Sequence, residues 1–210
     1  MQSMTMHLRR GVLTIETQSD ASLCEWLNAH SGQVFRLRSN KHGALVFHSL
    51  GLEEEACRVP LNITSRSPMP LRLISNFAHA PFILDGISFA SVEGFWQGLK
   101  FPDEGDRRRL AELYGSEAKD AGFYAPPATE IVYRGQAIRV GTYEHWELME
   151  LACRAKFEQN EAHCKALLDT SIRPLMHHMK RDSRTIPGVI MADIWTRIRD
   201  SLRKRYQKTD

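Results

Sequence analysis

The chain has 210 residues, of which 42% are hydrophobic and 25% are charged, a composition that excludes disorder along the whole chain and is typical of a folded globular protein. Its formal net charge of +3 is only mildly basic, so charge alone does not indicate nucleic-acid binding and only weakly favours anionic ligands. No apolar stretch reaches the roughly 20 residues that span a bilayer, and residues 1–10 do not resemble a cleaved leader.

The cysteines point to the same class of protein. Cys24, Cys57, Cys153 and Cys164 form no CxxC pair and no dense framework. In a chain of this length, that spacing predicts reduced, buried thiols. We therefore expect a cytoplasmic protein with no membrane partner.

Residues 1–70 are predicted to form an N-terminal extension that contains strands. The expected elements are a strand over 12–17, a short capped helix over 20–29, a hairpin made from 34–37 and 44–48, and a helical turn over 51–56. Residues 63–70 are polar and contain two prolines, which is typical of a connecting loop. We place the boundary there, so that residues 71–210 form the main domain.

In the main domain, Asp85-Gly86 between apolar pairs predicts a tight hairpin, and Ser91 is a good N-cap for a helix over 92–101. Thr142 is the expected cap of a long helix. The other predicted elements are a small hairpin made from 130–133 and 137–140, and helices over 103–114, 142–157, 161–168, 173–180 and 192–206. These elements predict an α+β domain that becomes helix-rich toward its C-terminus.

The helix start at Ser91 carries the chemistry-bearing pattern. Glu93 falls in the first turn, where the helix dipole favours the ionised carboxylate. An anion there suits a nucleophile, a general base or a stabiliser of positive charge better than a general acid. Glu93, Gln97 and Lys100 have the spacing of one helical stripe. The plain alternative is a solvated polar face.

Two glycines on the same helix, Gly94 and Gly98, are four residues apart. Each is a poor helix former, and together they leave one side of the helix without side chains. Such a gap allows a ligand or another backbone segment to approach closely.

These motifs resemble a known family. Ser75-Asn76-Phe77, the run from Pro81 to Phe89, and Ser91-Val92-Glu93 followed by Gln97 and Lys100-Phe101 are similar to the signature of the NADAR (NAD and ADP-ribose) superfamily, which includes the YbiA-like N-glycosidases. Trp146 and residues 151–160 resemble the family's later helix pair. The resemblance covers roughly residues 71–202. It implies a single helix-rich YbiA-like domain with short antiparallel strands.

The resemblance also implies a set of site residues. Glu93 and Asp182 map to catalytic positions, and the substrate-binding positions are Asn76, Phe77, Gln97, Lys100 and Trp146. Asn76 would bond ribose or base edges, Lys100 would hold a phosphate, and Trp146 would stack on a base. No step requires a metal or another cofactor. The plain alternatives are core packing for Trp146, a surface ion pair for Asp182, a helix-end charge for Lys100 and a turn for Asn76.

The function implied is an N-glycosidase, a hydrolase that cleaves an N-ribosyl bond. Two substrate classes remain open: ADP-ribose on a guanine base, free or in nucleic acid, and a ribosylamino-pyrimidine phosphate of riboflavin biosynthesis. The main alternative is a non-catalytic module that binds NAD or ADP-ribose, because residues 182–188 lack the Trp-Gly that the family usually has.

Two weaker hypotheses concern other residues. The basic C-terminal run predicts either a solvated helix face or contact with nucleic-acid phosphates; it comprises Arg197, Arg199, Arg203, Lys204, Arg205 and Lys208. The neighbouring His177 and His178, with His145, His163 and Cys164 elsewhere, match no recognised zinc spacing.

Overall fold

The structure, a computed structural model, describes residues 5–9, 12–16, 34–39, 45–50, 59–170 and 173–206. It divides the chain into two units, Met1–Val59 and Pro60–Asp210. The first unit contains two antiparallel pairs, β1 (Thr5–Arg9) with β2 (Val12–Glu16) and β3 (Val34–Ser39) with β4 (Leu45–Leu50). The predicted strand over 12–17 and the hairpin of 34–37 with 44–48 are confirmed. The helix and the helical turn expected over 20–29 and 51–56 lie outside the described residues.

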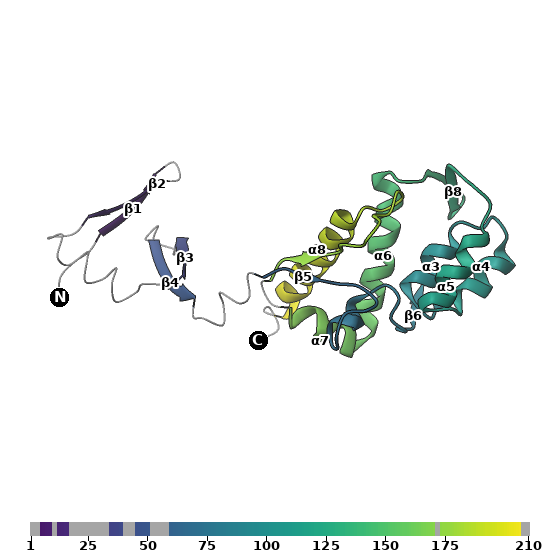
Figure 1. Ribbon diagram of the computed structural model, residues 1–210, viewed down its shortest axis with the longest axis horizontal. Coiled ribbons are helices and arrows are strands. Elements are labelled where there is room, and N and C mark those ends of the chain that lie inside the picture. Colours follow the sequence, from purple (N-terminus) through teal and green to yellow (C-terminus); the bar gives the residue numbers. More distant parts are fainter. Residues whose placement is uncertain are drawn as a thin grey trace. The chain divides into compact units, whose positions relative to one another are not determined.

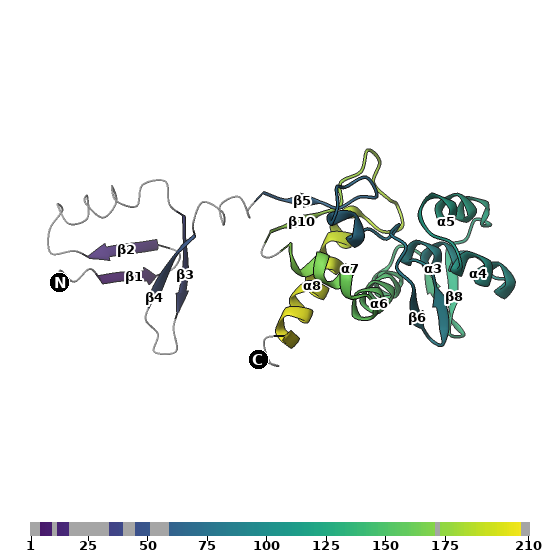
Figure 2. The ribbon, with the colours of Figure 1, turned by 90° about the horizontal axis from the view of Figure 1, so that it is seen from below.

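The second unit is built around one long helix, α6 (Tyr143–Gln159). Figures 1 and 2 show α7 (Glu161–Leu168) and α8 (Gly188–Tyr206) on one side of α6. On its other side lie α3 (Val92–Gly98), α4 (Glu104–Ala111) and α5 (Gly115–Ala121). Two 3-10 helices, η1 (Leu71–Ile74) and η2 (Gly122–Tyr124), complete the helical part. The unit is helix-rich, as predicted.

Short strand pairs decorate this unit. β6 (Phe82–Leu84) pairs with β7 (Ile87–Phe89), and β8 (Glu130–Tyr133) pairs with β9 (Gln136–Arg139), both antiparallel. Both hairpins turn through two residues with positive φ, Asp85-Gly86 at 54° and 76° and Arg134-Gly135 at 49° and 76°. That geometry is the type I′ turn that Asp-Gly predicts. The α+β fold with short antiparallel strands is therefore confirmed.

The prediction of a helix over 173–180 is wrong. The chain there is extended and contains β10 (Leu175–Met176), which pairs in parallel with β5 (Leu61–Asn62). The Leu61 N–H donates to the Pro174 carbonyl at 2.8 Å, and the Ile63 N–H to the Met176 carbonyl at 2.9 Å. A long-range partner thus takes the backbone groups that a helix would have paired locally.

The predicted helix over 103–114 is shorter than expected. Asp103 caps α4 by accepting from the Asp106 N–H at 2.9 Å, but α4 ends at Ala111. A separate helix, α5, follows at Gly115, whose φ of +61° interrupts the helical path. The sequence analysis did not predict α5. Thr142 lies at the N-cap of α6, yet its hydroxyl donates back to the Arg139 carbonyl at 2.9 Å instead of capping.

The core of the second unit lies around α6, which packs against α3 on one side and α8 on the other. The buried side chains there include Val92 and Phe95 from α3, Met149 and Cys153 from α6, and Ile194 and Ile198 from α8. Burial of each large side chain stabilises the fold by about 1.5–3 kcal/mol. Within the described residues, no helix is both long enough and apolar enough to cross a membrane.

Candidate active site

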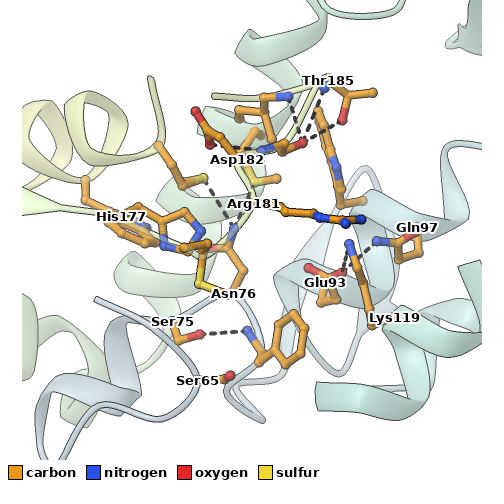
Figure 3. A pocket seen from close by; sticks show the side chains of 18 of the residues that line it. Ser65, Ser75, Asn76, Glu93, Gln97, Lys119, His177, Arg181, Asp182 and Thr185 are labelled. Carbon is orange, nitrogen blue, oxygen red and sulfur yellow. Dashed lines mark hydrogen bonds and ion pairs between the residues drawn. The ribbon is translucent and has the colours of Figure 1, made fainter. Parts of the chain in front are cut away.

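A cavity of about 390 Å³ opens in the second unit (Figure 3). Most of its lining comes from α3 and α5, from the segment 75–77, and from the chain between His177 and the first turns of α8, and Ser65 and Met149 of α6 complete it. This volume falls in the range that small-molecule ligands occupy. Six of the seven predicted site residues line the cavity, namely Asn76, Phe77, Glu93, Gln97, Lys100 and Asp182. The fold thus brings together side chains that lie up to about a hundred residues apart.

Glu93 is fixed in the cavity wall by backbone bonds on both sides. The Ser91 hydroxyl accepts from the Gly94 N–H at 2.9 Å, which confirms Ser91 as the N-cap of α3. The Glu93 N–H donates to the Asn76 carbonyl at 3.1 Å and ties α3 to the 75–77 segment. The Glu93 residue is only 5% exposed. The alternative of a solvated polar stripe is therefore wrong for this helix.

The electrostatics of Glu93 differ from those that its helix position predicts. Burial raises the pKa of its carboxyl above the ordinary value, because desolvation disfavours the charged form. Lys119, the hydrogen bond from Gln97, Lys100 and His177 all act in the opposite direction but do not cancel the effect of burial. The helix end alone predicts an anion that suits a general acid less well than a base or nucleophile, and burial acts against that prediction.

Gln97 binds Glu93 directly. Its Nε2 donates to Glu93 Oε1 at 2.6 Å, and the Gln97 residue is 1% exposed. The Gln97 Oε1 has no hydrogen-bond partner among the described residues. The amide packs against Gly122, where a Cβ would overlap the Gln97 side chain. Lys100, which follows α3, donates to the Gly122 carbonyl at 3.5 Å, so η2 packs against both residues.

The two glycines of α3 explain the close packing behind Glu93. A Cβ at Gly94 would lie 2.5 Å from the Leu110 carbonyl oxygen and 2.7 Å from that of Leu113. A Cβ at Gly98 would lie 3.6 Å from the Arg107 carbonyl oxygen, which is an ordinary contact. The gap that the glycines predict is thus filled by the backbone of α4 and the turn after it.

Asn76 lies in a surrounding rich in sulfur. Its Nδ2 donates to Met149 Sδ and Met191 Sδ, both at 3.4 Å, and the Cys153 thiol donates to its Oδ1 at 3.6 Å. Sulfur is a weak hydrogen-bond partner, so the amide keeps capacity for a stronger one from a ligand. Burial raises the pKa of the Cys153 thiol to about 12, which leaves it protonated as this donor.

A buried lysine holds the backbone before Asn76. Lys156 of α6 is fully buried, and its Nζ donates to the carbonyls of Ile74 and Ser75 at 3.1 and 2.7 Å. Burial lowers its pKa to about 7. A neutral amine has two N–H donors, which match these two carbonyls. Lys156 thereby links α6 to the segment that presents Asn76 and Phe77 to the cavity.

Asp182 lies on the loop before α8. Its Oδ1 accepts from the N–H groups of Ser183 and Gly188 at 2.9 and 2.8 Å, so the carboxylate fixes the loop to the first residue of α8. Asp182 lines the cavity, and its Oδ2 takes part in no hydrogen bond within the described part of the chain. The plain alternative of a surface ion pair is not what the geometry shows.

Trp146 is the one predicted site residue that the structure does not place in the cavity wall. Its Nε1 donates to the Thr185 carbonyl at 2.8 Å, and Thr185 does line the cavity. The tryptophans in the wall are Trp96 and Trp195. The Trp96 ring stacks on His145 with centroids 4.2 Å apart. Trp146 therefore supports the 182–186 loop from behind.

Three titratable residues in the wall had no role in the sequence analysis as substrate ligands: Lys119, His177 and Arg181. Lys119 comes from the unpredicted helix α5, and its Nζ lies 3.8 Å from Glu93 Oε1. His177 Nδ1 lies 2.7 Å from the Ile63 carbonyl, to which only a protonated Nδ1 can donate. No local sequence signal marks these residues, because their place depends on α5 and on the β5–β10 pairing.

The basic C-terminal run is largely engaged within the protein. Arg199 is 4% exposed and donates to Thr170 Oγ1 and to the Arg173 carbonyl. Arg197 pairs with Glu150 and Asp193, and Arg205 with Glu158. Lys208 lies outside the described residues. Within the part that the structure covers, no group of three or more His, Cys, Asp or Glu side chains could hold a metal ion.

Comparison with known proteins places this geometry in context. A family model described as bacteriophage protein GP30.3 matches residues 69–193. The uncharacterized 17.1 kDa protein of the Gp30–rIII intergenic region of Enterobacteria phage T4 is 32% identical over 154 residues, which cover 68% of this chain and 98% of that protein. The NMR structure of the E. coli protein YbiA is 23% identical and superposes with a TM-score of 0.55, over 71% of this chain and 88% of YbiA. The fold is therefore YbiA-like.

Proposed function

The chain belongs to the bacteriophage protein GP30.3 family, and we propose that it is an N-glycosidase that hydrolyses an N-ribosyl bond with Glu93 as the catalytic carboxylate. The observation that carries this proposal is a buried glutamate with a raised pKa in the wall of a cavity that Asn76, Gln97 and Asp182 also line. A buried carboxyl whose pKa is shifted, in the wall of a cavity, is a sign of acid–base chemistry. The YbiA-like fold and the resemblance to the NADAR superfamily support it.

The reaction breaks the bond between the anomeric carbon and the base nitrogen, and water adds to the carbon. Positive charge builds on the ribose as the bond breaks, and a nearby carboxylate stabilises it or takes the proton of the attacking water. Glu93 Oε1 accepts a hydrogen bond from Gln97, and Lys119 Nζ lies 3.8 Å from the same oxygen. We therefore assign Oε2 as the oxygen that stabilises the positive charge or takes the proton of the attacking water. A raised pKa brings the carboxyl closer to the operating pH of a general base or acid.

The other wall residues are assigned to binding. Asp182, whose Oδ1 is fixed by two backbone N–H groups, orients a ribose hydroxyl or the water through Oδ2. Asn76 exchanges its thioether partners for stronger acceptors on the ribose or base. Phe77 supplies an apolar surface, and Lys100 supplies positive charge. The proposed substrates are ADP-ribose linked to guanine, free or in nucleic acid, and a ribosylamino-pyrimidine phosphate.

The experiment is base release from each of these substrates by the wild type and by Glu93→Gln. The substitution keeps the size of the side chain and an Oε1 acceptor for Gln97 but removes the charge and the proton-accepting carboxylate. We expect at least a 100-fold loss of kcat, since positioned acid–base groups contribute about 10²–10⁴-fold. Glu117→Gln, at an exposed glutamate of α5, is the matched control.

Full activity of Glu93→Gln on every ribosyl substrate that the wild type cleaves would refute the assignment. Tight binding of ADP-ribose by the wild type, without turnover of any ribosylated base, would favour the alternative of a non-catalytic ADP-ribose-binding module.

A further inference from the structure

The cavity wall carries more positive than negative charge. Its charged side chains, apart from His177, are Lys100, Lys119 and Arg181 against Glu93 and Asp182. When both carboxylates are ionised they balance two of the three cations, so one positive charge remains in excess. The burial of Glu93, which raises the pKa of its carboxyl, acts to increase that excess. The imbalance indicates that an anion belongs in this cavity.

Lys119 is only loosely held by the protein. Its Nζ lies 3.8 Å from Glu93 Oε1, beyond hydrogen-bond distance, and its side chain is 59% exposed. Lys100 lies close enough that the like charge of Lys119 helps to lower its pKa. The two ammonium groups repel each other and share one buried carboxyl as counter-charge. A further anion bound between them would reduce this repulsion.

Arg181 faces this pair from the loop before α8. Figure 3 shows its guanidinium directed across the cavity toward the side on which Lys119 and Glu93 lie. Among the described residues, it takes part in no hydrogen bond or ion pair. An exposed arginine with a free planar fork, directed into a cavity, has the geometry that binds phosphate oxygens bidentately.

We propose that Lys119 and Arg181 form an anion subsite that binds a phosphate carried by the ribose of the substrate. This inference depends on the proposed function in one respect only, namely that the sugar attached to the phosphate is a ribose. It makes the enzyme select phosphorylated ribosides over plain nucleosides, because the two cations contact the phosphate and leave the ribose to Asn76 and Asp182. Lys100, held at the Gly122 carbonyl, supports the same charge from the α3 side.

The test is calorimetric binding by the full chain of four probes that are bound without base release: ribose, ribose 5-phosphate, ADP-ribose and inorganic phosphate. The variants are Lys119→Met, Arg181→Met and the double variant. Arg108→Met and Lys165→Met remove the same charges at residues whose side chains are 74% and 72% exposed and which do not line the cavity. Thermal unfolding checks that each variant is folded.

We expect the Kd of ribose 5-phosphate and of ADP-ribose to rise about tenfold in each single variant and more in the double variant. The affinity for ribose should not change, and the two controls should bind as the wild type does. A matching loss of inorganic phosphate binding in the same variants would also support the subsite. Phosphate esters that bind the double variant as well as the wild type would overturn it, as would equal losses for ribose and ribose 5-phosphate.

The result is independent of catalysis. Retained hydrolysis in Glu93→Gln, with phosphate binding still dependent on Lys119 and Arg181, would remove the proposed reaction and leave the subsite. Lost hydrolysis in Glu93→Gln, with phosphate binding indifferent to both cations, would do the reverse.

Discussion

The two glycines of α3 allow a prediction with a built-in control. Both face α4, four residues apart on the same helix. A Cβ at Gly94 would lie 2.5 and 2.7 Å from two backbone carbonyl oxygens, whereas a Cβ at Gly98 would meet its nearest atom at 3.6 Å. Alanine favours a helix over glycine by about 1 kcal/mol, and this gain applies at both positions. Overpacking a tight contact costs about 1–3 kcal/mol, and this cost applies only at Gly94.

We therefore expect Gly98→Ala to stabilise the protein by about 0.5–1 kcal/mol and Gly94→Ala to destabilise it by about 1–2 kcal/mol. The two melting temperatures should shift in opposite directions, by about 2–4 °C per kcal/mol. The assay is urea and thermal unfolding followed by circular dichroism at the helix band, since the described helices all lie after Pro60. Shifts of equal sign and size in the two variants would refute the packing of α4 against Gly94.

Two further predictions concern residues behind the cavity wall. For Trp146→Phe we expect a loss of about 0.5–1.5 kcal/mol of stability, from the missing bond to the Thr185 carbonyl, and a raised KM in the base-release assay. A KM equal to that of the wild type would contradict the role of this bond in supporting the 182–186 loop. The pKa of Lys156 is about 7 in the folded protein and 10.5 in the unfolded chain. Between these two pH values the unfolded chain binds more protons than the folded protein. The free energy of unfolding therefore rises as pH rises through that window. Lys156→Met should remove this rise in urea unfolding at pH 7, 8, 9 and 10; parallel curves for the two proteins would contradict the burial of a neutral amine.

Local signals sufficed where the partner of a backbone group is near in sequence. Asp85-Gly86 fixed a type I′ hairpin because only a few residue types accept positive φ at both positions. Ser91 predicted the start of α3 because its hydroxyl pairs with the N–H three residues on. The stripe from Glu93 to Gln97 followed from helical spacing, and the two side chains are hydrogen-bonded at 2.6 Å.

Long-range pairing decided what the local signals could not. Residues 173–180 have helical spacing, yet β5 takes their backbone groups from more than a hundred residues away. That pairing brings His177 and Arg181 to the cavity. Lys119 depends on α5, which starts at Gly115, a glycine with positive φ directly after the predicted helix over 103–114. The resemblance to a family named the positions that share its motif, but not these cations.

Two opposing effects set the pKa of Glu93, the helix dipole and desolvation by burial, and only the first can be predicted from the sequence. A place in the first helical turn can be recognised from Ser91 and the spacing after it, and it favours the anion by a few tenths of a kcal/mol to about 1 kcal/mol. Burial depends on contacts with other elements: the Asn76 carbonyl accepts from the Glu93 N–H, α4 lies close to Gly94 and Gly98, and Gly122 packs against Gln97. Desolvation of a buried carboxyl is the larger effect, so the pKa of Glu93 rises. The protonation of Glu93 is in this way set by the elements packed around it as much as by its own position in the helix.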